Sequence, residues 1–234
     1  MKSDLRFWGV DAKQLRAECA AFCKDCPSLD REALISSVNA LFATDWFDLR
    51  SVAIALLERK RRLLSADDAP WLIELARRGA CWAHVDYLVT KVIGPLLEGD
   101  RTLPKRVRAW GADKSFWVRR VALLAQLRAL RSGGGDFALF AELAGPMLAE
   151  NEFFVRKAIG WVLREVSKRR PALVRDFLID CGARCSGVTW REATKYLPTE
   201  MKQQVEARRL GATRARGADR RVEKNDGRAA KKKR

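Results

Sequence analysis

Trp82 and Asp86, four residues apart, form the first pair in this sequence whose types and spacing could do chemistry. In a helix this spacing places both side chains on one face. A carboxylate is an unexpected group on a surface that binds phosphate, because the two repel each other. Asp86 could form a salt bridge with an arginine of a neighbouring helix, or it could stabilise a positive charge on a ligand. The spacing alone leaves both interpretations open.

Trp161 is the second residue of this kind. Helical periodicity predicts a buried stripe formed by Ala158, Ile159, Val162, Leu163 and Val166. Trp161 follows Gly160 and lies off this stripe, on the side of the helix that carries Lys157, Arg164 and Lys168. A large aromatic residue at the edge of a stripe is commonly just half buried. The alternative is that its ring meets a ligand.

Several other kinds of site find no support in the sequence. It has no G-x-x-x-x-G-K-[ST] loop, no G-x-G-x-x-G after a strand and no helix–hairpin–helix signature with a catalytic lysine. The C-x3-C-x2-C run over residues 19–26 has the spacing of a radical-SAM cluster site, but it lies in an apolar helical stretch without a β/α pattern. A zinc site at Cys181 and Cys185 lacks histidines, since His84 is the only one. We therefore expect reduced, mostly buried thiols, no metal and no cofactor.

The charge of the chain points to a polyanionic partner. Its net charge is +17, of which residues 201–234 contribute +9 and residues 1–200 contribute +8. An excess of this size favours nucleic acid over a membrane surface. No apolar run approaches the roughly 20 residues that span a bilayer, and the N-terminus lacks the apolar core of a secretory signal. We expect a soluble monomer in the bacterial cytoplasm, associated with the nucleoid.

The elements that must position these residues are helices. Nothing reads as strand, and six of the seven prolines fall where helical patterns start or stop, at positions 27, 70, 104, 146, 171 and 198. Pro95 lies within an apolar helical run, where it predicts a kink. The predicted fold class is all-α.

Three stretches resemble one another: DWFDLRSVAIALLE (45–58), KSFWVRRVALLAQL (114–127) and NEFFVRKAIGWVLR (151–164). Their phenylalanines (Phe47, Phe116, Phe153) and arginines (Arg50, Arg119, Arg156) correspond. The offsets fit a period in the mid-thirties, with residues 81–97 in an intermediate slot. Paired helices at this period predict an α-solenoid of HEAT-like repeats with a concave groove, which the cations would make basic.

The repeat pattern ends near residue 199. We therefore predict a repeat domain over residues 1–199 and a basic, disordered tail over residues 200–234, rich in Arg, Lys, Ala and Gly. Such a tail either has no role or tethers the protein to DNA without sequence preference.

These residues resemble a known family. The stretches NEFFVRKAIGWVLREVSKRRP…WREATKYL, SFWVRRVALLAQL and CWAHVDYLV are similar to the AlkD-type DNA alkylation-repair glycosylases, which are HEAT-like repeat proteins. The resemblance runs from about Phe7 to Leu197. It implies that Asp86 is the catalytic carboxylate, that Trp82 and Trp161 are the groove tryptophans, and that Arg120 contacts a phosphate.

The resemblance further implies hydrolysis of the N-glycosidic bond of N3- and N7-alkylated purines in duplex DNA, without flipping the base into a pocket. An alkylated purine already carries positive charge and leaves readily, so Asp86 would stabilise the sugar cation and orient water. We add further DNA contacts from the cations of the similar helices: Arg119, Arg156, Lys157, Arg164 and Lys168.

Two other functions remain open at this point. The chain could be a non-catalytic HEAT-like protein that binds duplex or branched DNA, or a scaffold whose groove holds an acidic protein. The combination of Trp82, Asp86, Arg120 and Trp161 favours the enzyme, because a scaffold has no use for an acid beside tryptophans.

Overall fold

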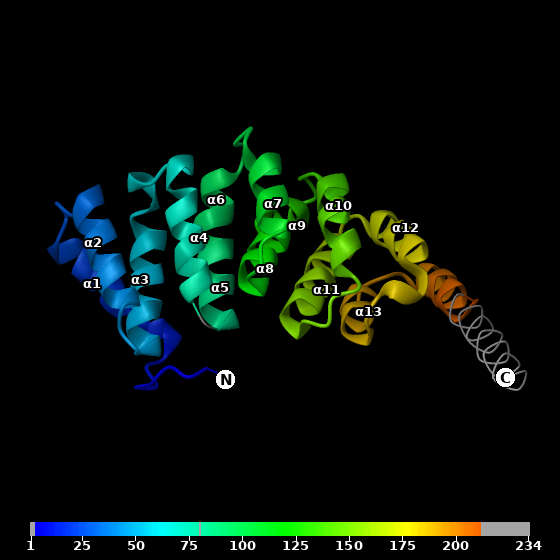
Figure 1. Cartoon of the computed structure of the whole chain (residues 1–234), viewed down its shortest axis with the longest axis horizontal. Coiled ribbons are helices and arrows are strands. Elements are labelled where there is room, and N and C mark those ends of the chain that lie inside the picture. Colours follow the sequence, from blue (N-terminus) through cyan, green and yellow to red (C-terminus); the bar gives the residue numbers. More distant parts are fainter. Residues whose placement is uncertain (1–2, 80, 212–234) are drawn as a thin grey trace, which may run out of the picture. The chain divides into compact units, whose positions relative to one another are not determined.

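The computed structural model describes residues 3–79 and 81–211, and they confirm the all-α class. The helices are α1 (Ala12–Asp25), α2 (Arg31–Phe42), α3 (Phe47–Arg59), α4 (Ala69–Arg78), α5 (Trp82–Leu88), α6 (Gly94–Leu97), α7 (Leu103–Gly111), α8 (Phe116–Leu124), α9 (Leu127–Arg131), α10 (Phe137–Met147), α11 (Phe153–Ser167), α12 (Pro171–Cys181) and α13 (Gly187–Ala193) (Figure 1). Among these residues no helix has both the length and the apolar character that crossing a bilayer requires.

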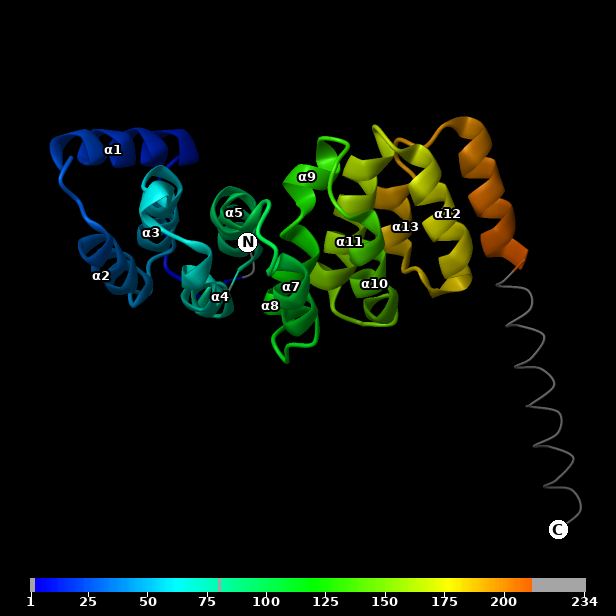
Figure 2. The same cartoon turned by 90° about the horizontal axis from the view of Figure 1, so that it is seen from above.

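The chain divides into two compact units, Met1–Leu143 and Ala144–Arg234. In the first unit α2 packs on α3, α4 on α5, and α7 on α8, while α5 also contacts both α3 and α8. Figures 1 and 2 show these pairs following one another along the unit. The predicted helix pairs are therefore present here.

Polar contacts join successive pairs at the predicted spacing. Trp71 Nε1 donates to Asn39 Oδ1 (3.0 Å), and two bidentate ion pairs, Arg77–Asp113 and Arg108–Glu142, bridge residues 36 and 34 apart. These separations match a repeat of about 35 residues, because each contact links one pair to the next.

The three similar stretches each form a helix that begins at the corresponding phenylalanine, in α3, α8 and α11. The arginine three residues later folds back onto the preceding loop. Arg50 donates to the Thr44 carbonyl (2.9 Å) and Arg119 to the Asp113 carbonyl (2.7 Å), each six residues earlier. Arg156 repeats this contact with the Glu150 carbonyl. The repeated arginine therefore fixes the turn that leads into each helix.

The irregularity predicted at Pro95 is a π-helical segment, η3 (Val89–Ile93), between α5 and α6. Proline has no N–H to donate to the carbonyl four residues back, at Lys91. Arg61 Nη1 takes that place and donates to the Lys91 carbonyl at 2.9 Å. Pro95 thus accounts for the altered turn, and Arg61 binds the carbonyl that the proline leaves without a backbone donor. Pro70, Pro104 and Pro171 lie in the first turns of α4, α7 and α12, as predicted, whereas Pro146 lies inside α10 near its end.

The second unit is built around α11, which packs against α12 and α13. Residues 199–211 are also helical, with Val205 buried and the Arg209 guanidinium 4.4 Å from the centre of the Trp190 ring. The predicted disorder is therefore wrong for residues 200–211, which form a mostly polar helix held by the buried Val205 and the Arg209–Trp190 contact, among others. Residues 212–234 lie outside the described residues.

Gly160 explains how closely α11 approaches α13. A Cβ added at this position would lie 2.7 Å from Glu192 Cβ and 3.2 Å from the Thr189 backbone.

We expect Gly160→Ala to lower the free energy of unfolding by about 1–3 kcal/mol, since neither neighbour is the end of a flexible side chain. Denaturant titration measures this. Gly187→Ala, at the first residue of α13, is the matched control, because its Cβ would meet only the end of the flexible Arg191 side chain, at 3.6 Å. A glycine-to-alanine change in an open helical position should stabilise by about 0.5–1 kcal/mol. Equal effects of the two substitutions would contradict the packing argument.

Candidate active site

Asp86 and Arg120 form the central contact of the candidate site. Arg120 Nε donates to Asp86 Oδ1 (2.7 Å) and Arg120 Nη2 donates to Asp86 Oδ2 (2.8 Å). The Arg120 side chain is 3% exposed, whereas 15% of the Asp86 side chain is exposed. A bidentate pair fixes the plane of the carboxylate. The arginine thus holds the carboxylate from the protein side, and one edge of Asp86 still reaches the surface.

The pair joins neighbouring helices, α5 and α8. Of the two interpretations of Asp86, the salt bridge with a neighbouring arginine is present. The salt bridge still lets the carboxylate interact with a ligand, because each of its oxygens has more than one lone pair. The structure therefore places an oriented and partly accessible negative charge between two helices.

Trp82 precedes Asp86 by one turn, as the first residue of α5. Its side chain is 43% exposed, and no α5 residue within the first turn is acidic. A half-exposed indole one turn from an accessible carboxylate offers a π face and a negative charge to the same ligand. Both groups favour a cation.

His84 anchors α5 in place. Its ring is buried, with Nε2 3.0 Å from Ser51 Oγ and 3.1 Å from the Phe47 carbonyl, and with Nδ1 3.2 Å from the Gly79 carbonyl. It also stacks on the Phe47 ring, with centroids 4.3 Å apart. The single histidine therefore fixes the helix that carries Trp82 and Asp86.

Burial lowers the pKa of His84 below its ordinary value, because the charged imidazolium is poorly solvated there. Above an unfolded-state pKa of about 6.5 the ring is neutral in both states and contributes no pH dependence. Below pH 6.5 the imidazole gains a proton in the unfolded chain but not in the folded chain. The free energy of unfolding should therefore fall as the pH drops from about 6.5 toward the lowered pKa. The slope should be at most roughly 1.4 kcal/mol per pH unit. Urea unfolding at several pH values checks this. His84→Gln should flatten the dependence in this window, and an unchanged slope would contradict it.

The second unit holds the other predicted residues, on α11. Trp161 is half-buried, and Lys157 is exposed, with Nζ 5.8 Å from the centre of the Phe153 ring. Arg164 forms an ion pair with Glu192, and Lys168 Nζ lies 2.9 Å from both carboxylate oxygens of Glu165. Two of the three cations on this face therefore have acidic partners. The sequence did not predict the Arg164–Glu192 pair, because its residues are 28 apart, whereas Glu165 and Lys168 are three apart, a spacing that a helix brings together.

Three arginines predicted to bind DNA have structural partners. Arg120 is committed to Asp86, while Arg119 and Arg156 bind the carbonyls of the preceding loops. A phosphate contact by Arg120 would require the buried pair to open. In the structure these three groups shape the site and its helices.

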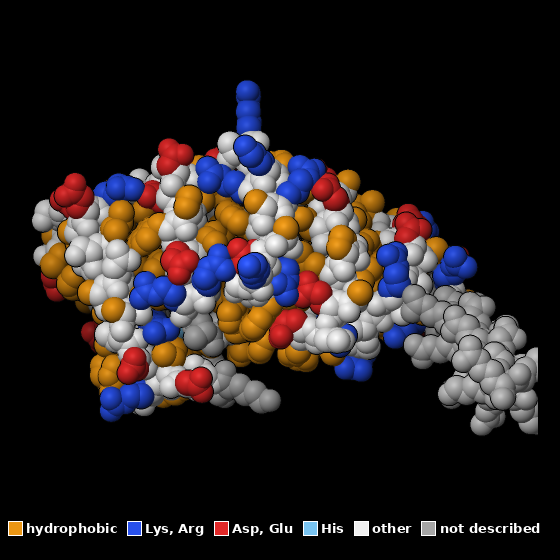
Figure 3. All heavy atoms as spheres, viewed as in Figure 1, with side chains coloured by type: hydrophobic (Ala, Val, Ile, Leu, Met, Phe, Trp, Pro, Cys, Tyr) orange, Lys and Arg blue, Asp and Glu red, His pale blue; other side chains and the backbone are white. Residues whose placement is uncertain are grey.

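Basic and acidic side chains intermingle on the face of the first unit that Figure 3 shows. The Arg77–Asp113 pair holds the pKa of Asp113 down to about 2, chiefly because Arg77 donates hydrogen bonds to the carboxylate. Arg108 likewise lowers the pKa of Glu142 by donating to it. These pairs neutralise part of the positive charge of the first unit.

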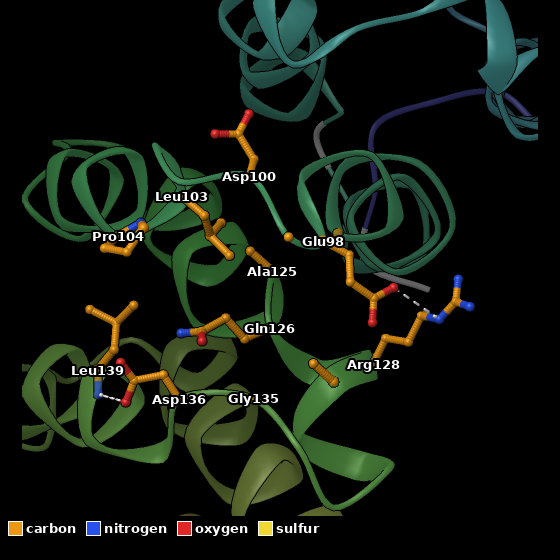
Figure 4. A pocket seen from close by; sticks show the side chains of 13 residues that line it. Glu98, Asp100, Leu103, Pro104, Ala125, Gln126, Arg128, Gly135, Asp136 and Leu139 are labelled. Atoms are coloured by element: carbon orange, nitrogen blue, oxygen red, sulfur yellow. Dashed lines mark hydrogen bonds and ion pairs between the residues drawn. The ribbon is translucent and has the colours of Figure 1, made fainter.

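A cavity of about 250 Å³ lies in the first unit, lined by residues of α6, α7, α9, α10 and the intervening loops (Figure 4). Three carboxylates line it, Glu98, Asp100 and Asp136, and Arg128 is paired with Glu98 at 3.3 Å. The acidic lining opposes phosphate, and neither Asp86 nor Trp82 borders the cavity. It is therefore separate from the candidate site.

The cysteines are free thiols, and four of them, Cys19, Cys81, Cys181 and Cys185, are buried. Burial is the main cause that raises the pKa of Cys19 to about 11. Within the described ranges no group of three or more His, Cys, Asp and Glu side chains is arranged to hold a metal ion.

Comparison with known proteins identifies the family. Residues 1–197 match the family model of the DNA alkylation repair enzymes. A solved structure, the predicted DNA alkylation repair enzyme from Enterococcus faecalis, superposes with a TM-score of 0.76 and 26% sequence identity, covering 84% of this chain and 90% of its own. A search of curated proteins gives no significant match. Because the family model spans most of the chain, the protein belongs to the family of DNA alkylation repair enzymes.

Proposed function

We propose that this protein is a monofunctional DNA glycosylase that hydrolyses the N-glycosidic bond of N3- and N7-alkylated purines in duplex DNA. The observation that carries the proposal is the Asp86 carboxylate, held by the buried Arg120 and accessible one turn from the exposed Trp82. In a DNA alkylation repair enzyme, such a group suits a substrate that is already cationic.

The reaction needs little from the protein beyond electrostatics. The bond between C1′ and the purine nitrogen breaks, and its electron pair neutralises the positive charge of the alkylated base. The deoxyribose becomes an oxocarbenium ion, which Asp86 stabilises at short range. The same carboxylate orients a water molecule, which adds to C1′ and loses a proton to solvent. The products are the free base and an abasic strand.

The remaining residues bind and position the substrate. Trp82 offers a π face to the cationic sugar, a contact worth about 0.5–2 kcal/mol, and Trp161 of the second unit is proposed as a nucleotide contact in its own right. Lys157, which is exposed, and Arg164 and Lys168, after exchange of their carboxylate partners, contact phosphates. Arg120 acts as a positioning residue for Asp86 in this proposal, not as the phosphate contact that the resemblance implies.

One observation favours a second function. The Asp86–Arg120 pair is complete without a ligand, so it could serve only to join α5 and α8 in a non-catalytic protein that binds duplex or branched DNA. Release of the alkylated base from a duplex decides between the glycosylase and the non-catalytic DNA-binding protein.

Product analysis tests the proposed reaction. The full chain is incubated with a duplex carrying one N7-methylguanine, and the released material and the strand are analysed separately. We expect free 7-methylguanine and an intact strand that breaks only on alkali treatment. Loss of the methyl group with the base retained, or direct strand cleavage, would contradict a monofunctional glycosylase. An undamaged duplex is the control.

A further inference from the structure

The N-terminal segment, residues 6–10, is attached to the start of α3 by a bridge between Arg6 and Trp46, and its backbone turns at Gly9, where φ is +79°. Arg6 N–H donates to the Asp45 carbonyl (2.8 Å), and the Arg6 carbonyl accepts from Phe47 N–H (2.9 Å). The buried Asp48 accepts from the backbone N–H groups of Trp8 (2.8 Å) and Val10 (3.1 Å). A carboxylate buried to bind two backbone amides fixes this segment firmly.

The segment presents aromatic rings to the surface. Trp8 stacks on Trp46 with ring centroids 4.5 Å apart, and the Arg6 guanidinium lies 4.2 Å from the centre of the Trp46 ring. Trp8 is nevertheless 57% exposed. A large ring that is both rigidly held and exposed is typical of recognition surfaces, because little conformational entropy is lost when it binds.

A chain of stacked rings connects this segment to α5. Phe7 stacks on Phe47 (4.8 Å), and Phe47 stacks on His84 (4.3 Å), which is two residues from Trp82. Figures 1 and 2 show the chain that precedes α1 passing beside the start of α3. Trp8 and Trp82 therefore belong to the same end of the first unit, where α3 and α5 begin.

We propose that Trp8 is a further DNA-contacting residue, whose ring stacks on a nucleotide of the bound strand near the lesion while Arg6 neutralises an adjacent phosphate. This inference rests on the proposed function. DNA is the partner that the observations favour, because the family repairs DNA, the chain carries a net charge of +17, and a cation accompanies the rings. In a duplex such a contact partly unstacks the base step beside the ring, and it is independent of sequence because every base has a π face.

Substitution of Trp8 tests the proposal. The affinity of the full chain for a duplex carrying a tetrahydrofuran abasic analogue is measured by fluorescence anisotropy, together with release of 7-methylguanine from the lesion duplex. We expect Trp8→Ala to weaken binding about 5- to 150-fold, and Trp8→Phe to retain most of the affinity. Phe22→Ala is the matched control, since Phe22 lies on α1 and is 46% exposed, and it should bind like the wild type.

The variants separate stacking from folding and from the proposed reaction. Trp8→Leu keeps an apolar contact with Trp46 but lacks a π face, so it should lose affinity as Trp8→Ala does, with an unchanged melting temperature. Wild-type affinity in Trp8→Leu and Trp8→Ala would overturn the inference and leave the glycosylase proposal standing. DNA binding by the wild type without release of base would overturn the glycosylase proposal, and the affinities would still decide the role of Trp8.

Discussion

Replacement of Asp86 by asparagine should lower the rate of 7-methylguanine release about 100- to 1000-fold, the effect typical of removing one preorganised electrostatic group from an active site. Asparagine has nearly the same shape but carries no charge, so it stabilises the oxocarbenium ion poorly. Affinity for the lesion duplex should hold or rise, because removal of a carboxylate removes repulsion from phosphate. Single-turnover kinetics and anisotropy measure the two quantities.

Asp113→Asn is the matched control for this variant. Asp113 also accepts two hydrogen bonds from an arginine of a neighbouring helix pair, at 2.8 and 2.9 Å from Arg77. It should leave the rate of base release within about twofold of the wild type. A comparable loss of rate in both variants would show that breaking an Arg–Asp pair, and not the charge of Asp86, causes the effect. Asp86→Asn also removes a charged hydrogen-bond acceptor from Arg120, at a cost of about 1–3 kcal/mol in stability, so rates are measured well below its melting temperature.

Arg120→Ala should have the largest effect on stability. It leaves the Asp86 carboxylate without its buried partner, and breaking such a pair costs about 3–5 kcal/mol. For a chain of this length the melting temperature should fall by roughly 6–20 °C. Calorimetry or circular dichroism measures the shift. Arg108→Ala, which breaks an exposed bidentate pair with Glu142, should leave the melting temperature close to that of the wild type.

The activity of Arg120 variants separates positioning from stability. Arg120→Lys keeps a positive charge but cannot bind both carboxylate oxygens in one plane. At a temperature where it is folded, we expect its kcat to fall while its KM changes little, since Asp86 is misoriented and DNA contacts remain. A raised KM with normal kcat would instead support the phosphate contact that the resemblance implies for Arg120.

The helices could be predicted from the sequence because their signals are local. Phe47, Phe116 and Phe153 mark the starts of three equivalent helices, and Pro70 and Pro104 fall in first turns. Hydrophobic periodicity and proline placement act within a few residues, so they predict a helix and its start without knowledge of the tertiary contacts.

The partners of the charged residues could not be predicted in the same way. Periodicity places an arginine on a face of its helix, but it does not show whether the long side chain bends back to a carbonyl or reaches outward. Arg119 and Arg156 bend back, which the sequence did not indicate. The helix over residues 199–211 was missed because its one buried apolar residue, Val205, leaves too weak a periodic signal.

The repeat itself contains a signal for the Asp86–Arg120 contact. Arg120 and Ser51 are each four residues after the phenylalanine that begins their helix, and Ser51 contacts His84 of α5 from the other side. Equivalent positions on α3 and α8 thus both face α5. Alignment of the repeats identifies the position that meets α5, although only the structure shows that an arginine there binds Asp86.

A time course of free 7-methylguanine release under single-turnover conditions tests the role of Asp86 most directly, with wild type, Asp86→Asn and no protein side by side on one lesion duplex. We predict release by the wild type well above the spontaneous rate, and release by Asp86→Asn close to it. Equal release by the two proteins would remove Asp86 from the reaction. No release from either, with tight and salt-sensitive binding, would contradict the glycosylase and leave a DNA-binding protein in which Asp86 and Arg120 only join two helices.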